Sequence, residues 1–141
     1  MASTAVETDP RLITFMLPSI PESVRMARFY VRAALGFHGL DEYADDASII
    51  TSELLTNAIQ HVCSDGRETV GVTLACTRNP EGVTVVVSDS SPAGPVMRET
   101  SADSTQGRGL QIVEALSAQW GWHPECGGKA IFAILAREAG T

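Results

Sequence analysis

The segment from Asp41 to His61 constrains the fold more than any other part of the chain, because its apolar residues recur with the period of an α-helix. Four acidic residues lie near its start, where the helix dipole favours negative charge, and Gly66 follows its end. At about 100° per residue the apolar side chains form a single stripe that predicts the face packed on the core. The stripe consists of Ala47, Ile50, Leu54 and Ala58.

Three polar residues follow one flank of this stripe. Glu53, Asn57 and His61 are spaced four residues apart, which places them in a row at the edge of the buried face. A carboxylate, an amide and an imidazole in a row can orient a nucleophile, coordinate a hard cation and meet a phosphate. The alternative is that they occupy the solvated shoulder of an amphipathic helix, and the helix alone does not decide between the two.

The rest of the pattern predicts two further helices and five strands. Strands are expected over residues 11–17, 69–77, 83–87, 120–122 and 130–136, and helices over residues 21–35 and 107–116. Residues 83–87 are almost all β-branched, which predicts a central strand with both faces covered. The segment between this strand and the last helix is long and polar, which is typical of a functional loop. Residues 1–10 are expected to be a flexible N-terminus, so that residues 11–141 form a single domain.

Charge and cysteine content exclude several classes of function. The 141 residues include 10 Lys and Arg against 17 Asp and Glu, a net charge of −7. An acidic chain without a basic stripe argues against nucleic acid as a direct ligand. Three widely spaced cysteines fit free thiols in a reducing compartment, and no secretion signal or apolar run of about 20 residues is present. We therefore expect a cytoplasmic protein that acts neither on nucleic acid nor at a membrane.

Three further clusters carry residues of functional type. Asp89 ends a strand, where its carboxylate can accept a hydrogen bond from a ligand amine or, alternatively, from its own turn. The run Gly107-Arg108-Gly109-Leu110 stands at a helix start, where free N–H groups favour phosphate, although a flexible turn is the alternative. The run Gly127-Gly128-Lys129-Ala130 precedes the last strand and by itself predicts a hairpin turn.

Other nucleotide and metal motifs are not matched. The segment Gly128-Lys129-Ala130 lacks the upstream glycine and the Ser or Thr of a P-loop, and no strand runs directly into the glycines at position 107. The segments His61-Val62-Cys63 and His123-Pro124-Glu125-Cys126 contain metal-ligand types but no paired zinc spacing. We expect structural roles for both.

Taken in order, the clusters resemble the Bergerat ATP-binding fold of the histidine-kinase-like ATPases (the GHKL superfamily). Within it they resemble the anti-sigma factor serine/threonine kinases of actinobacterial type. The resemblance runs from the strand Phe15-Met16-Leu17-Pro18 to the last strand, and residues 53–61 and 107–116 are its most specific parts. It implies an α/β fold of the α+β two-layer kind, with helices covering one face of a mixed, mostly antiparallel sheet.

The resemblance also implies a role for each cluster. Glu53 would orient a serine hydroxyl, or a water, for attack on the γ-phosphate of ATP, and Asn57 would hold Mg²⁺. Asp89 would accept from the adenine amine, and residues 93–106 would form a lid over the nucleotide. The expected nucleotide-binding residues are Asn57, His61, Asp89, Gly94, Gly107, Arg108, Gly109 and Leu110.

The implied function is that of an ATP-dependent protein kinase. It would phosphorylate a serine on an anti-anti-sigma partner of the STAS type and sequester a sigma factor, regulating transcription by partner switching. The resemblance also implies a homodimer. Arg25 and Arg28 of the first helix are the candidate partner contacts, and the alternative is that both are solvated helix arginines.

Two departures from the family pattern motivate a second interpretation. Ala130 stands where the family has a Thr that supports the adenine, and the glycine loop after Asp89 is altered to Ser91 and Ala93-Gly94. The alternative function is therefore a kinase-inactive, nucleotide-gated regulator that binds a partner protein. A sensor histidine kinase fragment is a third interpretation, but the chain leaves no room for the helix pair that bears a phosphoacceptor histidine.

Overall fold

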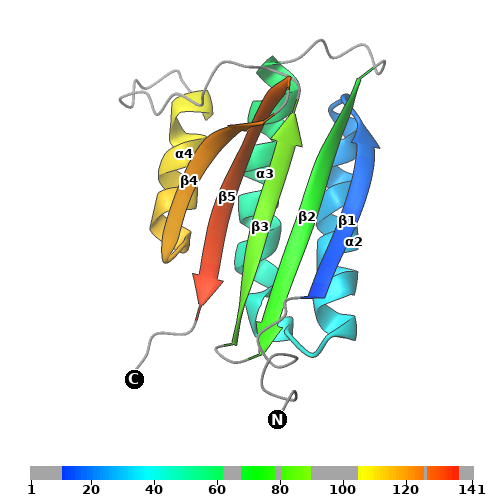
Figure 1. The fold of residues 1–141 in the computed structure, drawn as a ribbon, viewed down its shortest axis with the longest axis vertical. Coiled ribbons are helices and arrows are strands. Elements are labelled where there is room, and N and C mark those ends of the chain that lie inside the picture. Colours follow the sequence, from blue (N-terminus) through cyan, green and yellow to red (C-terminus); the bar gives the residue numbers. More distant parts are fainter. Residues whose placement is uncertain (1–10, 62–67, 79–80, 90–104, 126, 137–141) are drawn as a thin grey trace.

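The computed structural model describes residues 11–61, 68–78, 81–89, 105–125 and 127–136, and these form two layers (Figure 1). One layer is a five-stranded sheet, and the other contains three α-helices. In chain order the elements are β1 (Arg11–Pro18), α2 (Glu22–Phe37), the 3₁₀ turn η1 (Asp41–Tyr43), α3 (Ala44–His61), β2 (Thr69–Arg78), β3 (Glu81–Asp89), α4 (Thr105–Leu116), β4 (Gln119–Glu125) and β5 (Gly128–Ala136).

The strands follow the order β1-β2-β3-β5-β4 across the sheet. Every pairing between the described strands is antiparallel, so the predicted fold class is confirmed while no parallel pair is seen among them. After β3 the chain passes through α4 to the edge strand β4 and then returns as β5 beside β3. The end of β3 and the start of β5 therefore lie next to each other, with Asp89 directly opposite Lys129.

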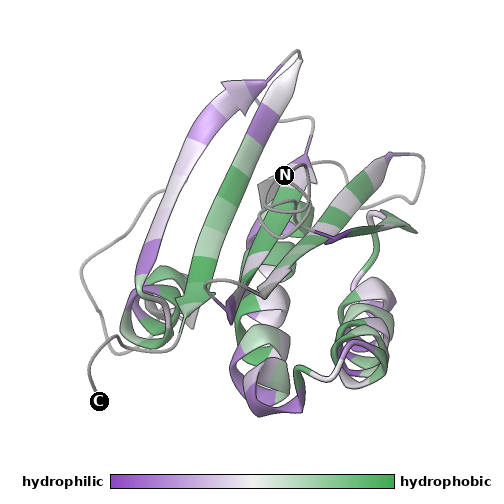
Figure 2. Ribbon diagram, turned by 60° about the horizontal axis from the view of Figure 1, so that its bottom comes forward, coloured by the Kyte–Doolittle hydropathy of each residue, from purple (hydrophilic) through white to green (hydrophobic). Residues whose placement is uncertain are grey.

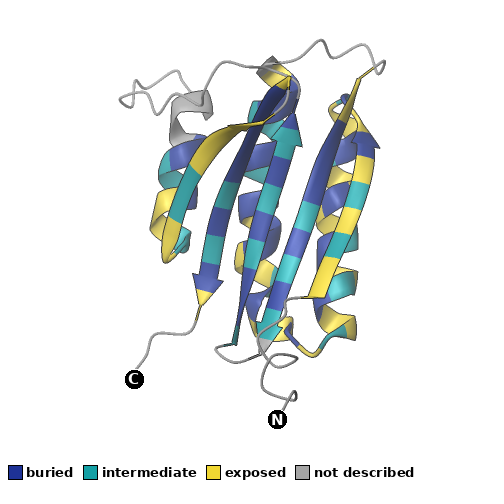
Figure 3. Ribbon diagram, in the orientation of Figure 1, coloured by how far each residue is buried: buried dark blue, intermediate teal, exposed yellow. Residues whose placement is uncertain are grey.

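All three α-helices cover the same face of the sheet (Figure 2). Along β3 the odd-numbered residues Val83, Val85 and Val87 point toward the helices and are buried, whereas Thr84 and Val86 on the other face are only half-buried (Figure 3). The prediction that both faces of this strand are covered is therefore wrong. We call the uncovered side the open face of the sheet.

The apolar stripe of the second predicted helix is confirmed. Ala47, Ile50, Leu54 and Ala58 are all fully buried on the sheet side of α3. The helix begins with the 3₁₀ turn at Asp41 and becomes α-helical at Ala44. None of the helices in the described ranges is long and apolar enough to cross a bilayer.

The C-terminal ends of α3 and β3 and the N-terminal ends of α4 and β5 all lie at the upper end of the sheet in Figure 1. We call this the β3–β5 end. At the same end Gly127, with a φ of 76°, forms the turn between β4 and β5, as the glycine pair predicted.

Candidate functional site

Glu53 lies on α3 against the first turns of α4. A Cβ atom added to Gly109 would lie 3.1 Å from Oε2 of Glu53 and 3.8 Å from its Cβ, so α4 approaches the carboxylate through a residue without a side chain. Burial raises the pKa of Glu53, because it disfavours the charged form of the carboxyl group. The structure therefore brings together two motifs that lie far apart in the sequence, and the carboxylate where they meet is partly desolvated.

Asn57 follows Glu53 by one turn of α3 and is half-buried on the same flank. His61 is the last residue of the helix, and its side chain lies outside the described part of the chain. The described residues contain no group of three His, Cys, Asp or Glu side chains that could hold a metal ion. Mg²⁺ bound to a nucleotide commonly takes few ligands from the protein and several from phosphates and water. A single amide oxygen at Asn57 therefore fits such an ion.

Asp89 and Lys129 form a buried ion pair at the β3–β5 end. The Lys129 Nζ atom lies 3.1 Å from Oδ1 and 3.0 Å from Oδ2 of Asp89, and neither side chain is exposed to solvent. The two residues are directly opposite each other on β3 and β5, on the face that the helices cover. Taken alone, the run that contains Lys129 predicts a hairpin turn and assigns this lysine no role of its own. The sequence did contain a signal for this pair, because Lys129 stands at the start of an apolar strand. Lysine is almost never fully buried unless it is paired, so a lysine at such a position indicates a nearby partner of opposite charge.

The structure corrects the inference drawn from Ala130. Successive residues of a strand point to opposite faces of the sheet. Ala130 is opposite Ser88 and His123 on the open face, whereas Asp89 points to the helix side. A side chain at position 130 therefore does not lie beside the Asp89 carboxylate, and the residue that does is Lys129.

Arg25 and Arg28 are exposed on α2 and line a groove between α2 and α3. The groove has a volume of about 490 Å³, and Glu53 is among the α3 residues that line it. Arg32 lines it as well and forms an exposed ion pair with Asp45 at 2.8 Å. The candidate partner residues and the candidate catalytic residue thus share one surface.

The remaining expected site residues are placed only in part. Gly94 and residues 93–104 of the expected lid lie outside the described residues, and α4 already begins at Thr105, within the range expected for the lid. The backbone of Gly107 and Arg108 belongs to the first turns of α4. The Leu110 side chain is buried in the core, so only its backbone could contribute to a ligand site.

The exposed pair of His123 and Glu125, 3.6 Å apart on β4, has no third metal-ligand type near it among the described residues. Cys63 and Cys126 lie outside the described part of the chain, and Cys76 is a buried free thiol. Nothing in the described part of the chain therefore points to a metal site at either histidine segment.

Comparisons with known proteins identify the family of this fold. Residues 17–134 match the family model of the histidine kinase-like ATPase domain. The crystal structure of the RsbU and RsbW domains of Rv1364c from Mycobacterium tuberculosis shares the fold, with a TM-score of 0.66 and 21% identity over 92% of this chain and 34% of that one. A histidine kinase domain from Erythrobacter litoralis EL346 blue-light activated histidine kinase matches with a TM-score of 0.46 and 25% identity, over 68% of this chain and 45% of that one.

The chain thus spans less than half the length of either solved chain. A search of curated proteins finds no match. The family match nevertheless covers both specific motifs, the flank of α3 and the start of α4. This chain belongs to the histidine kinase-like ATPase domain family.

Proposed function

We propose that this domain binds ATP with Mg²⁺ and transfers the γ-phosphate to a serine of an anti-anti-sigma protein of the STAS type. By sequestering a sigma factor it would regulate transcription through partner switching. The observation that carries the proposal is the position of Glu53, which borders the α2–α3 groove and also contacts α4 at Gly109. A hydroxyl group that enters from the groove and a phosphate held by α4 would meet at this carboxylate.

In the proposed reaction Glu53 accepts a hydrogen bond from the serine hydroxyl. It takes the proton as the serine oxygen bonds to the γ-phosphorus and the bond from phosphorus to the ADP oxygen breaks. Phosphoryl transfer has a loose transition state, so orientation of the hydroxyl matters more than its early deprotonation. The burial that raises the pKa of Glu53 also makes it a better proton acceptor than an exposed glutamate.

The other site residues would hold the nucleotide. Asn57 is assigned to Mg²⁺, which when bound neutralises phosphate charge next to a chain of net charge −7. The free N–H groups of the first turn of α4 would bind phosphate oxygens, and the glycines there allow close approach. Asp89 would accept from the adenine amine. His61, Gly94 and Arg108 are retained as expected contacts on the strength of the resemblance.

The α2–α3 groove is the surface we assign to the partner protein. Arg25 and Arg28 give it positive charge in an otherwise acidic chain, since Arg32 is paired with Asp45, and Phe29 adds an apolar side chain that is 68% exposed. Such a surface is complementary to an acidic patch with an apolar centre. The double variant Arg25→Glu/Arg28→Glu should lose partner capture in a pull-down and keep its ATP affinity. Arg11→Glu, a charge reversal at the exposed start of β1, is the matched control and should bind normally.

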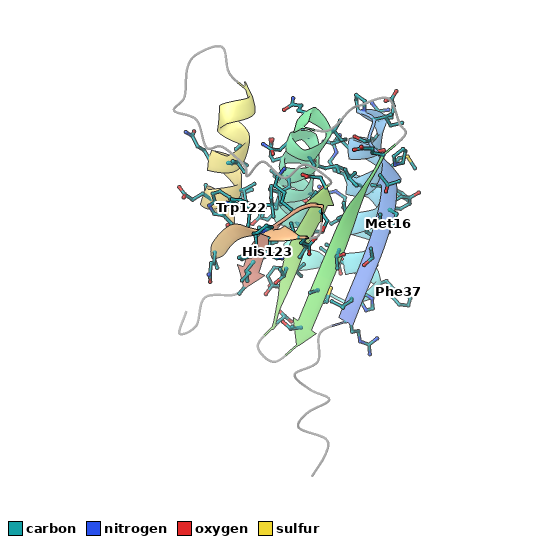
Figure 4. All side chains as sticks on the ribbon, turned by 45° about the horizontal axis from the view of Figure 1, so that its top comes forward. Met16, Phe37, Trp122 and His123 are labelled. Carbon is teal, nitrogen blue, oxygen red and sulfur yellow. The ribbon has the colours of Figure 1, made fainter. Side chains whose placement is uncertain are left out.

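A homodimer, a cytoplasmic location and the actinobacterial type are further parts of the proposal. The open face offers a surface for self-association, because Leu12 and Met16 of β1 are more than 60% exposed there. Met16 lies toward one edge of the sheet, while His123, which is opposite Ala130 on the open face, lies toward the other (Figure 4). Light scattering during size-exclusion chromatography would give the mass of the particle and test the dimer.

The decisive assay measures transfer of labelled phosphate from ATP to candidate STAS proteins. Wild type should transfer label to a serine, and Glu53→Ala should not. Label transfer by Glu53→Ala at the wild-type rate would contradict the assignment of Glu53 as the catalytic residue. ATP binding without any transfer, by a protein that still captures its partner, would favour the kinase-inactive regulator. That alternative has less support than the sequence indicated, since position 130 faces away from Asp89.

A further inference from the structure

The buried pair of Asp89 and Lys129 lies at the edge of the core, next to the proposed nucleotide site. On the helix side of the sheet it directly follows the apolar pair formed by Val87 and Ile131. Burying two charges is expensive, and well-packed apolar residues of similar volume are often at least as stabilising. The stability of the sheet therefore does not account for a lysine at this position.

The ammonium group of Lys129 has donor capacity beyond this ion pair. An ammonium group carries three N–H donors. Among the described residues, both polar contacts of Lys129 go to the carboxylate of Asp89. At least one N–H donor therefore remains for another acceptor. A buried donor that bonds to nothing is costly, so a ligand acceptor at this place would be favourable.

We propose that Lys129 is a base-recognition residue that donates a hydrogen bond to ring nitrogen N1 of adenine while Asp89 accepts from the neighbouring 6-amino group. In the proposed complex the two side chains, whose charged atoms lie 3.0–3.1 Å apart, would offer an acceptor and a donor side by side, which complements the donor and acceptor on that edge of adenine. Lys129 also holds the Asp89 carboxylate in place through the ion pair. The inference deepens the proposed function and rests on nucleotide binding at Asp89.

The same arrangement discriminates against guanine. Guanine presents a carbonyl oxygen where adenine has its amino group, and an N–H donor where adenine has N1. In the proposed orientation the carbonyl oxygen would face the Asp89 carboxylate, and the N–H would face the Lys129 ammonium group. An acceptor would then face an acceptor and a donor would face a donor, which disfavours the binding of guanine.

The test changes one atom of the ligand and leaves the protein as it is. Wild type is titrated by calorimetry with Mg·ATP and with the 1-deaza analogue, in which a C–H group replaces N1. A hydrogen bond to a charged group predicts that the analogue binds about tenfold more weakly or worse. The 7-deaza analogue, altered on the other edge of the base, is the matched control and should bind like ATP.

A variant of Lys129 tests whether this side chain is the donor to N1. Lys129→Met should bind ATP and the 1-deaza analogue equally, because it lacks the donor that distinguishes them. If this variant fails to fold, the comparison of ligands on wild type still tests whether N1 accepts a hydrogen bond, which the inference requires. Equal affinity of wild type for ATP and the 1-deaza analogue would overturn the inference. Absence of any ATP binding by wild type would instead refute the proposed function, and this inference with it.

Discussion

Replacing Gly109 by alanine should separate the activity of this domain from its stability. The new Cβ atom would lie 3.1 Å from Oε2 of Glu53, whereas ordinary van der Waals contact begins at 3.4 Å. The carboxylate is the far end of a flexible side chain, so it can move by the few tenths of an ångström that are required. The substitution therefore shifts the proposed catalytic group without disturbing the core.

The substitution should leave the stability unchanged or raise it, and should lower the rate of phosphate transfer. Alanine in a helix is favoured over glycine by about 0.5–1 kcal/mol, so the free energy of unfolding should stay unchanged or rise by up to that amount. A misplacement of about 1 Å in a catalytic constellation can reduce the rate 10²-fold. A shift of a few tenths of an ångström in Glu53 should thus lower phosphate transfer roughly threefold to tenfold.

Thermal unfolding followed by circular dichroism measures the first quantity, and transfer of labelled phosphate from saturating ATP measures the second. Calorimetry of ATP binding shows separately whether the added methyl group hinders the nucleotide. Gly36→Ala in α2 is the matched control, because its Cβ would lie 3.2 Å from Oδ1 of Asp41, away from the β3–β5 end. It should change stability similarly and leave transfer intact. Transfer at the wild-type rate by Gly109→Ala would refute the placement of Glu53 at the reacting hydroxyl.

Three further substitutions test other parts of the site. Asp89→Asn leaves the Lys129 ammonium group buried beside a neutral amide, so it should cost about 3–5 kcal/mol in denaturant unfolding and weaken ATP binding about tenfold or more; unchanged unfolding and affinity would contradict the buried pair. Glu53→Gln should match wild-type stability below the ordinary glutamate pKa of about 4.3, and should become the more stable protein as pH rises toward the raised pKa of Glu53, because ionisation of this buried carboxyl costs free energy only in wild type. A difference of the opposite sign at neutral pH would show that the carboxylate is stabilised where it lies. Gly127→Ala forces a side chain into the left-handed region and should destabilise the fold by about 1–2 kcal/mol in the same denaturant assay, whereas an unchanged midpoint would argue against the φ of 76°.

Features that depend on local periodicity were predictable from the sequence. The buried stripe of α3 follows from the spacing of Ala47, Ile50, Leu54 and Ala58, and the flank that carries Glu53 and Asn57 follows from the same spacing. The five strands and three helices were also predicted, with shifts of a few residues at their ends. Helix and strand ends depend on the contacts of the terminal residues, which periodicity does not specify.

Strand pairing was not predictable in the same way. Asp89 and Lys129 meet because the chain crosses through α4 and β4 before β5 returns beside β3, and no local pattern records that crossover. The inference that a side chain at position 130 lies beside Asp89 was wrong for a related reason. Side chains alternate between the faces of a strand, so an offset of one residue moves a side chain to the opposite side of the sheet.

The β-branched run from Val83 to Val87 led to the wrong prediction that both faces of β3 are covered, because this composition predicts a strand but not the burial of its two faces. Valine and threonine favour a pleated strand whether or not a second layer covers it. Their presence on β3 therefore predicts the strand correctly and says little about what lies on the open face. The contact between Glu53 and Gly109 is likewise invisible to local pattern, since it depends on how α3 and α4 pack together.

Hydrogen–deuterium exchange with and without Mg·ATP tests the central claim most directly, namely that the nucleotide binds at the β3–β5 end of the sheet. We predict that ATP slows amide exchange in the second half of α3, at the end of β3 and in the first turns of α4. Exchange around Gly36 and Tyr43 should be unchanged, and Mg·UTP is the matched control for charge. Protection confined to the open face or to the opposite end of the sheet, or no protection at all, would contradict the account.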